Sequence, residues 1–159
     1  MIWTPHLETN RLTLRQLTLD DAGLMLAIWN DPAFVRHVGD RGIRTMADAQ
    51  EAMCQGILRL YEEHGYGPYR VALQETGQPI GICGLFRRDC FDVPDIGYST
   101  LPEFCGHGYA YEGACAVIDS AAAGLGLGLA VGMAPVGDSD LTGVTLLLEM
   151  PDGNTGVDV

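Results

Sequence analysis

The stretch that decides the fold is DIGYSTLPEFCGHGYAYEG, residues Asp95–Gly113. Its first part, Asp95–Leu101, has the residue types of a β-strand, and the proline that follows ends that strand. The alanine-rich segment Tyr109–Ala123 has apolar residues at helical spacing. A strand therefore passes through a short glycine-containing loop directly into a helix.

Such a junction is suited to bind a diphosphate. The first N–H groups of a helix have no partner within the helix, and the helix dipole adds a positive potential. Gly106 and Gly108 have no Cβ, which lets the backbone approach phosphate oxygens closely. A nucleotide-binding P-loop needs Lys and then Ser or Thr after its second glycine, and a dinucleotide-binding loop needs a third glycine where Tyr111 stands. A strand–helix turn without a ligand stays open as the plain alternative.

The rest of the chain predicts a mixed α/β domain. We expect strands at 11–17, 69–73, 80–86, 95–101 and 127–133, and helices at 19–30, 46–63, 109–123 and 141–150. Short links between the middle strands predict antiparallel pairing. A helix joins the strands at 95–101 and 127–133, which predicts that these two run parallel. The capping pair Thr45 and Asp48 marks the start of the second helix, and Gly65 marks its end.

Composition narrows the class of protein. A chain of 159 residues with 47% apolar and 19% charged residues suits one globular domain, which we place at 1–159. The net charge of −12 argues against a nucleic acid partner and favours a cationic one, although acidity also serves solubility alone. No stretch before residue 120 is long and apolar enough for a membrane span, and we interpret the uncharged segment Ala121–Val136, rich in Gly, Pro and Met, as a turn and a buried strand, so we expect no membrane partner.

The cysteines and the first residues bear on location. The five cysteines are scattered and form no CxxC pair, which argues against a zinc site, and we expect no metal. The chain begins without a basic segment followed by an apolar run, so we expect no secretory signal. Reduced thiols then indicate a cytoplasmic protein.

Several motifs together resemble the GNAT N-acetyltransferases, and within them the branch that acetylates the amino termini of ribosomal proteins. These motifs are Leu7–Arg15 followed by Asp20-Asp21-Ala22, Pro79–Leu85, Ile96-Gly97-Tyr98, and Gly106-x-Gly108-Tyr109-Ala110-x-Glu112. The resemblance covers residues 7–123, and residues 124–159 diverge. It implies a mostly antiparallel sheet flanked by helices, with one parallel pair of strands splayed at the site of acetyl-coenzyme A.

The resemblance also implies an activity and its residues. The chain would be an acyltransferase that passes the acetyl group to a primary amine, either a protein amino terminus or a small molecule, by direct attack. The cosubstrate residues would be Tyr98, Ser99, Thr100 and Leu101 along the pantetheine arm, and Gly106, His107, Gly108, Tyr109 and Ala110 around the pyrophosphate.

Two carboxylates are the candidate catalytic groups. Asp95 is the first candidate for the general base, with an exposed aspartate at the strand end as the alternative. Glu112 is the second candidate, and its alternative role is to favour the start of the helix.

The C-terminal part departs from the family pattern. Asp140 and Gly143 stand where the family has Asn and Ser, and residues 121–159 contain no Lys, Arg, His or aromatic residue. The final strand of the fold is not recognisable in this part. A catalytically weak CoA-binding or interaction protein on the same fold is therefore the alternative function, and a structural α/β domain without a ligand is a third. Both a monomer and a homodimer remain open.

Overall fold

A seven-stranded sheet in sequential order β1 to β7 organises the computed structural model of the chain, which describes residues 5–87, 94–125, 129–132 and 147–149. The first five strands pair antiparallel in sequence order. They are β1 (His6–Glu8), β2 (Leu12–Gln16), β3 (Pro68–Leu73), β4 (Pro79–Phe86) and β5 (Asp95–Thr100). The sixth strand, β6 (Leu129–Gly132), runs parallel to β5, and β7 (Leu147–Glu149) runs antiparallel to β6.

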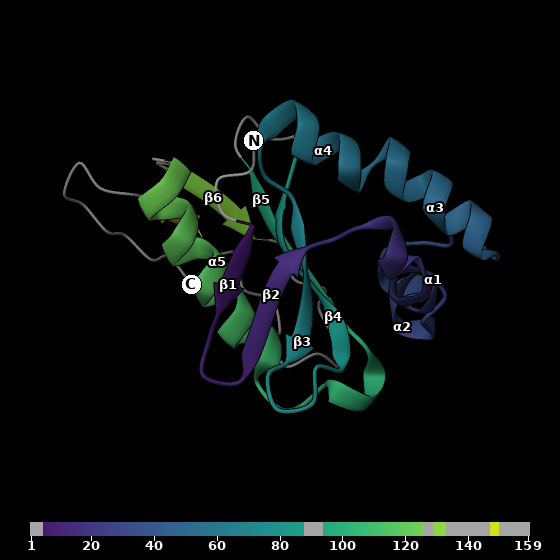
Figure 1. The fold of residues 1–159 in the computed structure, drawn as a ribbon, viewed down its shortest axis with the longest axis horizontal. Coiled ribbons are helices and arrows are strands. Elements are labelled where there is room, and N and C mark those ends of the chain that lie inside the picture. Colours follow the sequence, from purple (N-terminus) through teal and green to yellow (C-terminus); the bar gives the residue numbers. More distant parts are fainter. Residues whose placement is uncertain (1–4, 88–93, 126–128, 133–146, 150–159) are drawn as a thin grey trace.

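Helices cover both faces of this sheet (Figure 1). On one face lies α5 (Tyr109–Leu125), and on the other lie α1 (Ala22–Trp29), α3 (Met46–Gln55) and α4 (Ile57–His64). Two short elements, η1 (Leu19–Asp21) and α2 (Pro32–His37), flank α1, and η2 (Pro102–Phe104) follows β5. None of the helices in the described part of the chain combines the length and the hydrophobicity needed to span a bilayer.

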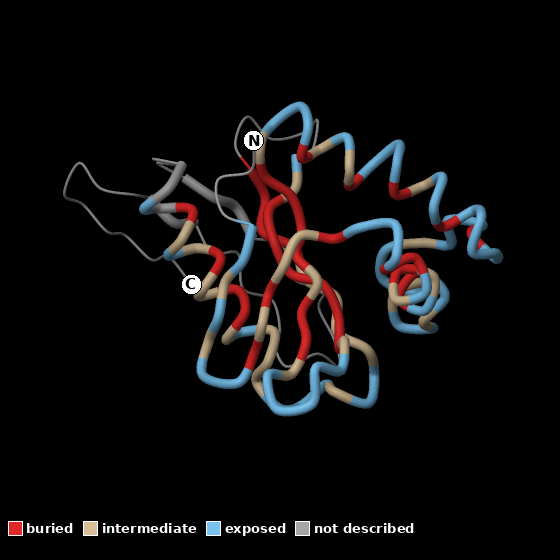
Figure 2. Tube along the Cα trace, in the orientation of Figure 1, coloured by how far each residue is buried: buried red, intermediate tan, exposed pale blue. Residues whose placement is uncertain are grey.

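The hydrophobic core has two parts, separated by the sheet. Adjacent side chains of a strand point to opposite faces of the sheet. On β4, Cys83 therefore packs with α5 in one part of the core, here called the α5 cluster, while Ile82 packs with α1, α3 and α4 in the other part. On α5, Ala114, Val117 and Ala121 form the buried stripe. Figure 2 shows that burial is concentrated on the central strands and on the helix sides that face them.

The structure confirms most of the predicted elements, including the parallel pairing of β6 with β5. The prediction of a single helix at 46–63 is wrong. Gly56, with φ −112° and ψ −86°, lies outside the helical region of backbone conformations and separates α3 from α4. The expected end at Gly65 is confirmed, since this residue has φ 72° and closes α4.

The prediction for the C-terminal part is wrong where the structure describes it. We expected a helix at 141–150 and no final strand, yet Leu147–Glu149 forms β7. A run of leucines suits a buried strand as well as a helix, and pairing with β6 decides between them. The remainder of the expected helix lies outside the described residues.

An ion pair ties the start of the first helical segment to the sheet. The Arg15 guanidinium donates to both carboxylate oxygens of Asp21 at 2.8 and 2.9 Å, and Nε of Arg70 lies 3.5 Å from the same group. The Thr18 N–H also donates to it at 2.9 Å. Desolvation works to raise the pKa of Asp21, but these donors outweigh it and leave that pKa below its usual range.

We expect Asp21→Asn to lower the free energy of unfolding by about 2–3 kcal/mol, because it leaves two guanidinium groups without their anion. The lowered folded-state pKa adds stability above the unfolded-state pKa, about 3.9, and this stability is lost as pH falls through the folded-state value. Urea unfolding from pH 7 down to pH 3 measures both effects.

The exposed Asp48→Asn is the comparison for that series, since its carboxylate caps α3 without a buried ion pair. An Asp21→Asn protein as stable as the natural one at pH 7 would contradict the role of this ion pair.

Candidate functional site

The loop between β5 and α5 has the backbone of an anion site. Gly106 and Gly108 have φ of 84° and 76°, a region that residues with a Cβ rarely occupy. The first backbone bond of α5 runs from the N–H of Glu112 to the carbonyl of Gly108 at 3.1 Å. The N–H groups of the three residues before Glu112 therefore have no acceptor within the helix. Such a helix start can bind a phosphate oxygen.

Strand β5 leads into this loop from the middle of the sheet. Its ladder with β4 runs along its whole length, whereas its parallel ladder with β6 joins only Asp95 to Val131 and Ile96 to Gly132. Beyond β5, the Leu101 N–H donates to the Ile80 carbonyl at 2.8 Å and prolongs the contact with β4. This parallel ladder runs to Gly132, which is the last described residue of β6.

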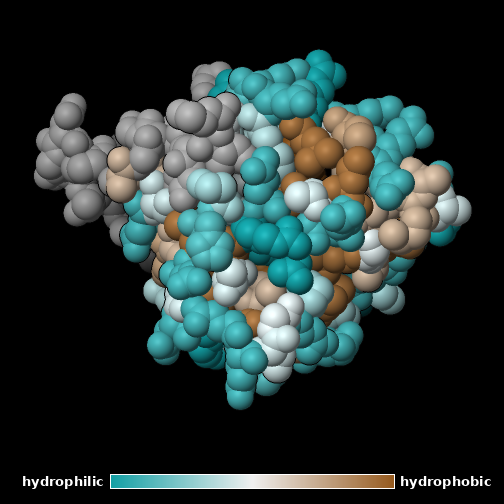
Figure 3. Space-filling view, viewed as in Figure 1, coloured by the Kyte–Doolittle hydropathy of each residue, from teal (hydrophilic) through white to brown (hydrophobic). Residues whose placement is uncertain are grey.

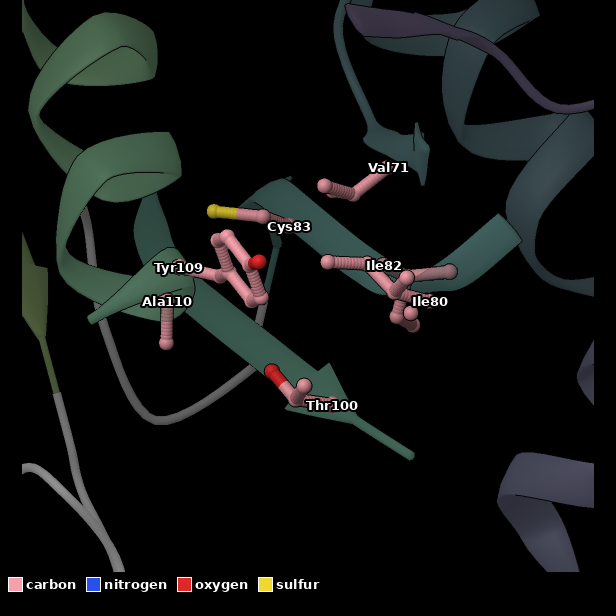
Figure 4. A pocket seen from close by; sticks show the side chains of 8 residues that line it. Val71, Ile80, Ile82, Cys83, Thr100, Tyr109 and Ala110 are labelled. Atoms are coloured by element: carbon pink, nitrogen blue, oxygen red, sulfur yellow. The ribbon is translucent and has the colours of Figure 1, made fainter. Parts of the chain in front are cut away.

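A small cavity lies beside the helix start (Figure 4). It is partly open to solvent, has a volume of only about 10 Å³, and lies between β4, the end of β5 and the first turn of α5. Three of the predicted cosubstrate residues line it, namely Thr100, Tyr109 and Ala110. Figure 4 shows Tyr109 and Ala110 on one side of this space and Ile80 and Ile82 of β4 on another. The remaining predicted cosubstrate residues are not in its lining.

The turn before β2 contacts the loop and α5. The Glu112 carboxylate accepts from the Thr9 hydroxyl at 2.6 Å, from the Arg11 N–H at 2.9 Å and from Arg11 Nε at 2.7 Å. The same guanidinium donates through Nη1 to the His107 carbonyl at 3.0 Å, and its Cζ lies 4.5 Å from the centre of the Tyr109 ring. Sequence reasoning missed Arg11 as a site residue. Its membership of the Leu7–Arg15 motif was the available signal, but nothing in one sequence pairs it with a helix about a hundred residues later.

The environment of Glu112 makes it a poor proton acceptor. Desolvation by burial works to raise its pKa, but the hydrogen bonds from Thr9 and Arg11 outweigh that effect and leave the pKa below its usual range. A carboxylate that is stabilised as the anion takes up a proton weakly. The geometry therefore favours a structural role for Glu112 at the start of α5.

Asp95 occupies a different environment. Its side chain is fully buried, with 0% exposure, so the alternative of an exposed aspartate at the strand end is wrong. It stands in the sheet opposite Phe86 of β4 and Val131 of β6. Since Ile96 packs in the α5 cluster, the alternation of the strand places Asp95 on the face of α1, α3 and α4.

The other predicted site residues lie at the edges of the two core clusters or at the surface. Tyr98 packs at the edge of the α5 cluster, and Leu101 packs at the edge of the other cluster. His107 is exposed, and its ring lies 5.6 Å from that of Tyr109. Within the described residues, no group of three or more His, Cys, Asp or Glu side chains is placed to hold a metal ion.

Comparison with known proteins gives a family for this geometry. Residues 11–136 match the family model of the acetyltransferase (GNAT) domain. The uncharacterized N-acetyltransferase p20 of Bacillus licheniformis is 31% identical over 114 residues, which are 71% of this chain and 64% of that protein. The chain thus spans slightly less than two thirds of the length of this relative.

Solved structures agree with that match. An acetyltransferase from Agrobacterium tumefaciens str. C58 is 30% identical, with a TM-score of 0.68 over 81% of this chain and 73% of that one. The ribosomal L7/L12 alpha-N-protein acetyltransferase RimL, solved in complex with coenzyme A, is 16% identical, with a TM-score of 0.64 over 78% of this chain and 71% of that one. The latter likeness is one of fold.

The loop glycines allow a direct test of the anion site. We expect Gly108→Ala to lower the free energy of unfolding by about 1–2 kcal/mol, because an L-residue is strained at φ 76°. The added Cβ should also weaken the binding of coenzyme A about tenfold by obstructing the approach to the helix start. Isothermal titration calorimetry and urea unfolding measure the two effects.

Gly77→Ala is the matched control. Gly77 lies in the turn between β3 and β4 with φ 72°, and a Cβ added there would meet no other atom within 4 Å. The control therefore carries the same backbone strain far from the loop. Equal affinities of the two variants for coenzyme A would exclude this loop as the phosphate site.

Proposed function

The chain belongs to the GNAT acetyltransferase family, and on that premise we propose that it transfers the acetyl group of acetyl-coenzyme A to a primary amine. The acceptor is a protein amino terminus or a small-molecule amine. The observation that carries this proposal is the start of α5, where two glycines of positive φ precede N–H groups that have no acceptor in the helix.

The residues of the loop fit a diphosphate. In our assignment, the backbone N–H groups of Gly106, Gly108, Tyr109 and Ala110 hold the pyrophosphate of the cosubstrate, with His107 in the same loop. The pantetheine arm runs along the backbone of Tyr98, Ser99, Thr100 and Leu101. Thr100 lines the cavity beside the helix start, which supports this path.

The chemistry asks little of the protein beyond placement and proton transfer. The amine nitrogen bonds to the thioester carbon, the carbon–sulfur bond breaks, and the proton of the amine must leave. Holding a neutral amine against an activated thioester supplies most of the acceleration. We assign Asp95 as the group that accepts this proton, directly or through one water molecule. We assign to Glu112 the structural role of holding the loop in place. The lowered pKa of Glu112 and the burial of Asp95 support this division.

The net charge supports an amine acceptor. At −12, the protein attracts cations over a distance set by the ionic strength. RimL is a ribosomal L7/L12 alpha-N-protein acetyltransferase, and another structural neighbour is a spermidine N-acetyltransferase chimera, so the fold accepts protein and polyamine amines in those proteins. The cytoplasmic location and the oligomeric state remain predictions.

One observation favours a second candidate, a CoA-binding protein with little catalysis. Residues 121–159 contain no Lys, Arg, His or aromatic side chain, and the Asn and Ser of the late family motif are replaced by Asp140 and Gly143. No group downstream of α5 is thereby identified as a proton donor for the departing thiol.

We expect coenzyme A to bind the purified protein and primary amines to accelerate the release of its thiol from acetyl-coenzyme A. Calorimetry measures the first, and a thiol-reactive dye measures the second over a panel of spermidine, amino acids and short peptides. Binding without any amine-dependent thiol release would favour the second candidate, and an absence of binding would exclude both.

Asp95→Asn should lower the rate about a hundredfold near pH 7, the usual contribution of a general base. The loss should shrink as pH approaches the pKa of the acceptor, because the amine then arrives without its extra proton. The pH–rate profile of the variant checks this, with the melting temperature as a test of folding.

Asp119→Asn, on the exposed side of α5, is the control and should keep the natural profile. An unaltered profile in Asp95→Asn would clear Asp95 of this role.

A further inference from the structure

Arg11 contacts His107 and Tyr109 from outside the loop and lies beside Gly108 between them. Its Nη1 donates to the His107 carbonyl at 3.0 Å, and its Cζ lies 4.5 Å from the centre of the Tyr109 ring. Between them, Nη2 lies 3.6 Å from the point where a Cβ on Gly108 would stand. One guanidinium therefore packs along the backbone at the point where α5 begins.

The bond to His107 fixes an amide as well as a carbonyl. In a trans peptide the C=O of one residue and the N–H of the next point in opposite directions, and the described part of the chain contains no cis peptide. With the His107 carbonyl held toward Arg11, the N–H of Gly108 must point away from Arg11. Gly108, directly after this peptide bond, and Gly106, one residue before His107, both have positive φ, and glycine itself restrains the orientation of the peptide little.

The charge of Arg11 has a second consequence for the loop. Glu112 lies in the first turn of α5, close to the N–H groups that would hold a diphosphate, and a bare carboxylate there would repel an anion. Arg11 Nε lies 2.7 Å from Glu112 Oε2 and compensates that charge. The carboxylate in turn orients the guanidinium, so one ion pair serves both the shape and the potential of the loop.

The backbone around Arg11 is itself held in place by hydrogen bonds. Its carbonyl accepts from the Gln74 N–H at 2.9 Å, and the Gln74 side chain donates to the Leu12 carbonyl at 3.0 Å. The Thr9 hydroxyl bonds both the Glu112 carboxylate and the Leu12 N–H. The turn before β2 is therefore joined to β3 and to α5, which makes it a rigid support.

We propose that Arg11 is a positioning residue for the diphosphate of coenzyme A, acting through the His107–Gly108 peptide and through Glu112. This inference rests on the proposed function. A surface ion pair adds little to stability, and the Arg11 side chain is 44% exposed. Loss of the side chain should therefore weaken cosubstrate binding without unfolding the protein.

The test compares Arg11→Met and Arg11→Lys with the natural protein and with Arg59→Met. Arg59 forms a similar surface ion pair with Glu63 on α4, remote in the fold from the loop, and it is the matched control. Isothermal titration with coenzyme A should show binding about tenfold weaker for Arg11→Met, as expected for the loss of a charge-assisted hydrogen bond. Arg59→Met should bind within about twofold of the natural protein.

Arg11→Lys should not restore the affinity, because an ammonium group cannot bridge the Glu112 carboxylate and the His107 carbonyl in the plane of a guanidinium. A second readout needs no ligand. In ¹⁵N spectra of the free protein, the amide signals of residues 107–110 should shift or broaden in Arg11→Met, and they should stay in place in Arg59→Met.

The outcomes separate the proposed function from the role of Arg11. If the natural protein does not bind coenzyme A, the proposed function fails. If it binds and Arg11→Met binds equally well, only the role of Arg11 is overturned. Full restoration by lysine would reduce that role to charge alone and would also overturn the proposal. Should Arg11→Met not fold, Arg11→Gln, which keeps donors for the carboxylate, replaces it in the same comparison.

Discussion

The Glu112 carboxylate and its three donors join the first strands of the chain to the first turn of α5. Glycine restrains the backbone little, so contacts with neighbouring residues help to set the direction of the N–H groups in this loop. Here the neighbour is the turn before β2, which lies about a hundred residues earlier in the sequence. The contact therefore links the N-terminal strands to the first turn of α5, beside the loop that we propose as the phosphate site.

The sheet has a different function on each face. On one face the apolar stripe of α5 packs against the strands, which fixes the helix and therefore the position of the loop. On the other face, α1, α3 and α4 cover the side to which Asp95 belongs. The space-filling view shows apolar residues gathered in a hollow near α4, between surfaces that are largely hydrophilic (Figure 3). In the proposed mechanism, Asp95 and the cosubstrate residues further along β5 would place proton transfer and thioester binding on one strand.

Local sequence signals predicted the elements that stand on local physics. The alternation at β2, the capping pair Thr45 and Asp48, and the left-handed end at Gly65 all depend on neighbours within a few residues, and all are present. The prediction of one helix at 46–63 failed because apolar spacing continues across Gly56, although the backbone does not. The prediction of a final helix failed because a run of leucines has no periodicity that distinguishes a helix from a strand. Pairing with β6 makes Leu147–Glu149 the strand β7.

The sequence by itself determined that a strand, two glycines and a helix start follow one another, and hence that backbone N–H groups could face an anion. This followed from residue types along one short stretch, where the missing Cβ and the unpaired amides are local properties. Only the tertiary structure decided the fates of the two carboxylates: Glu112 is held by Thr9 and Arg11, and Asp95 is buried inside the sheet. The environment of a carboxylate depends on groups brought near it by the fold, and those groups lie far away along the chain.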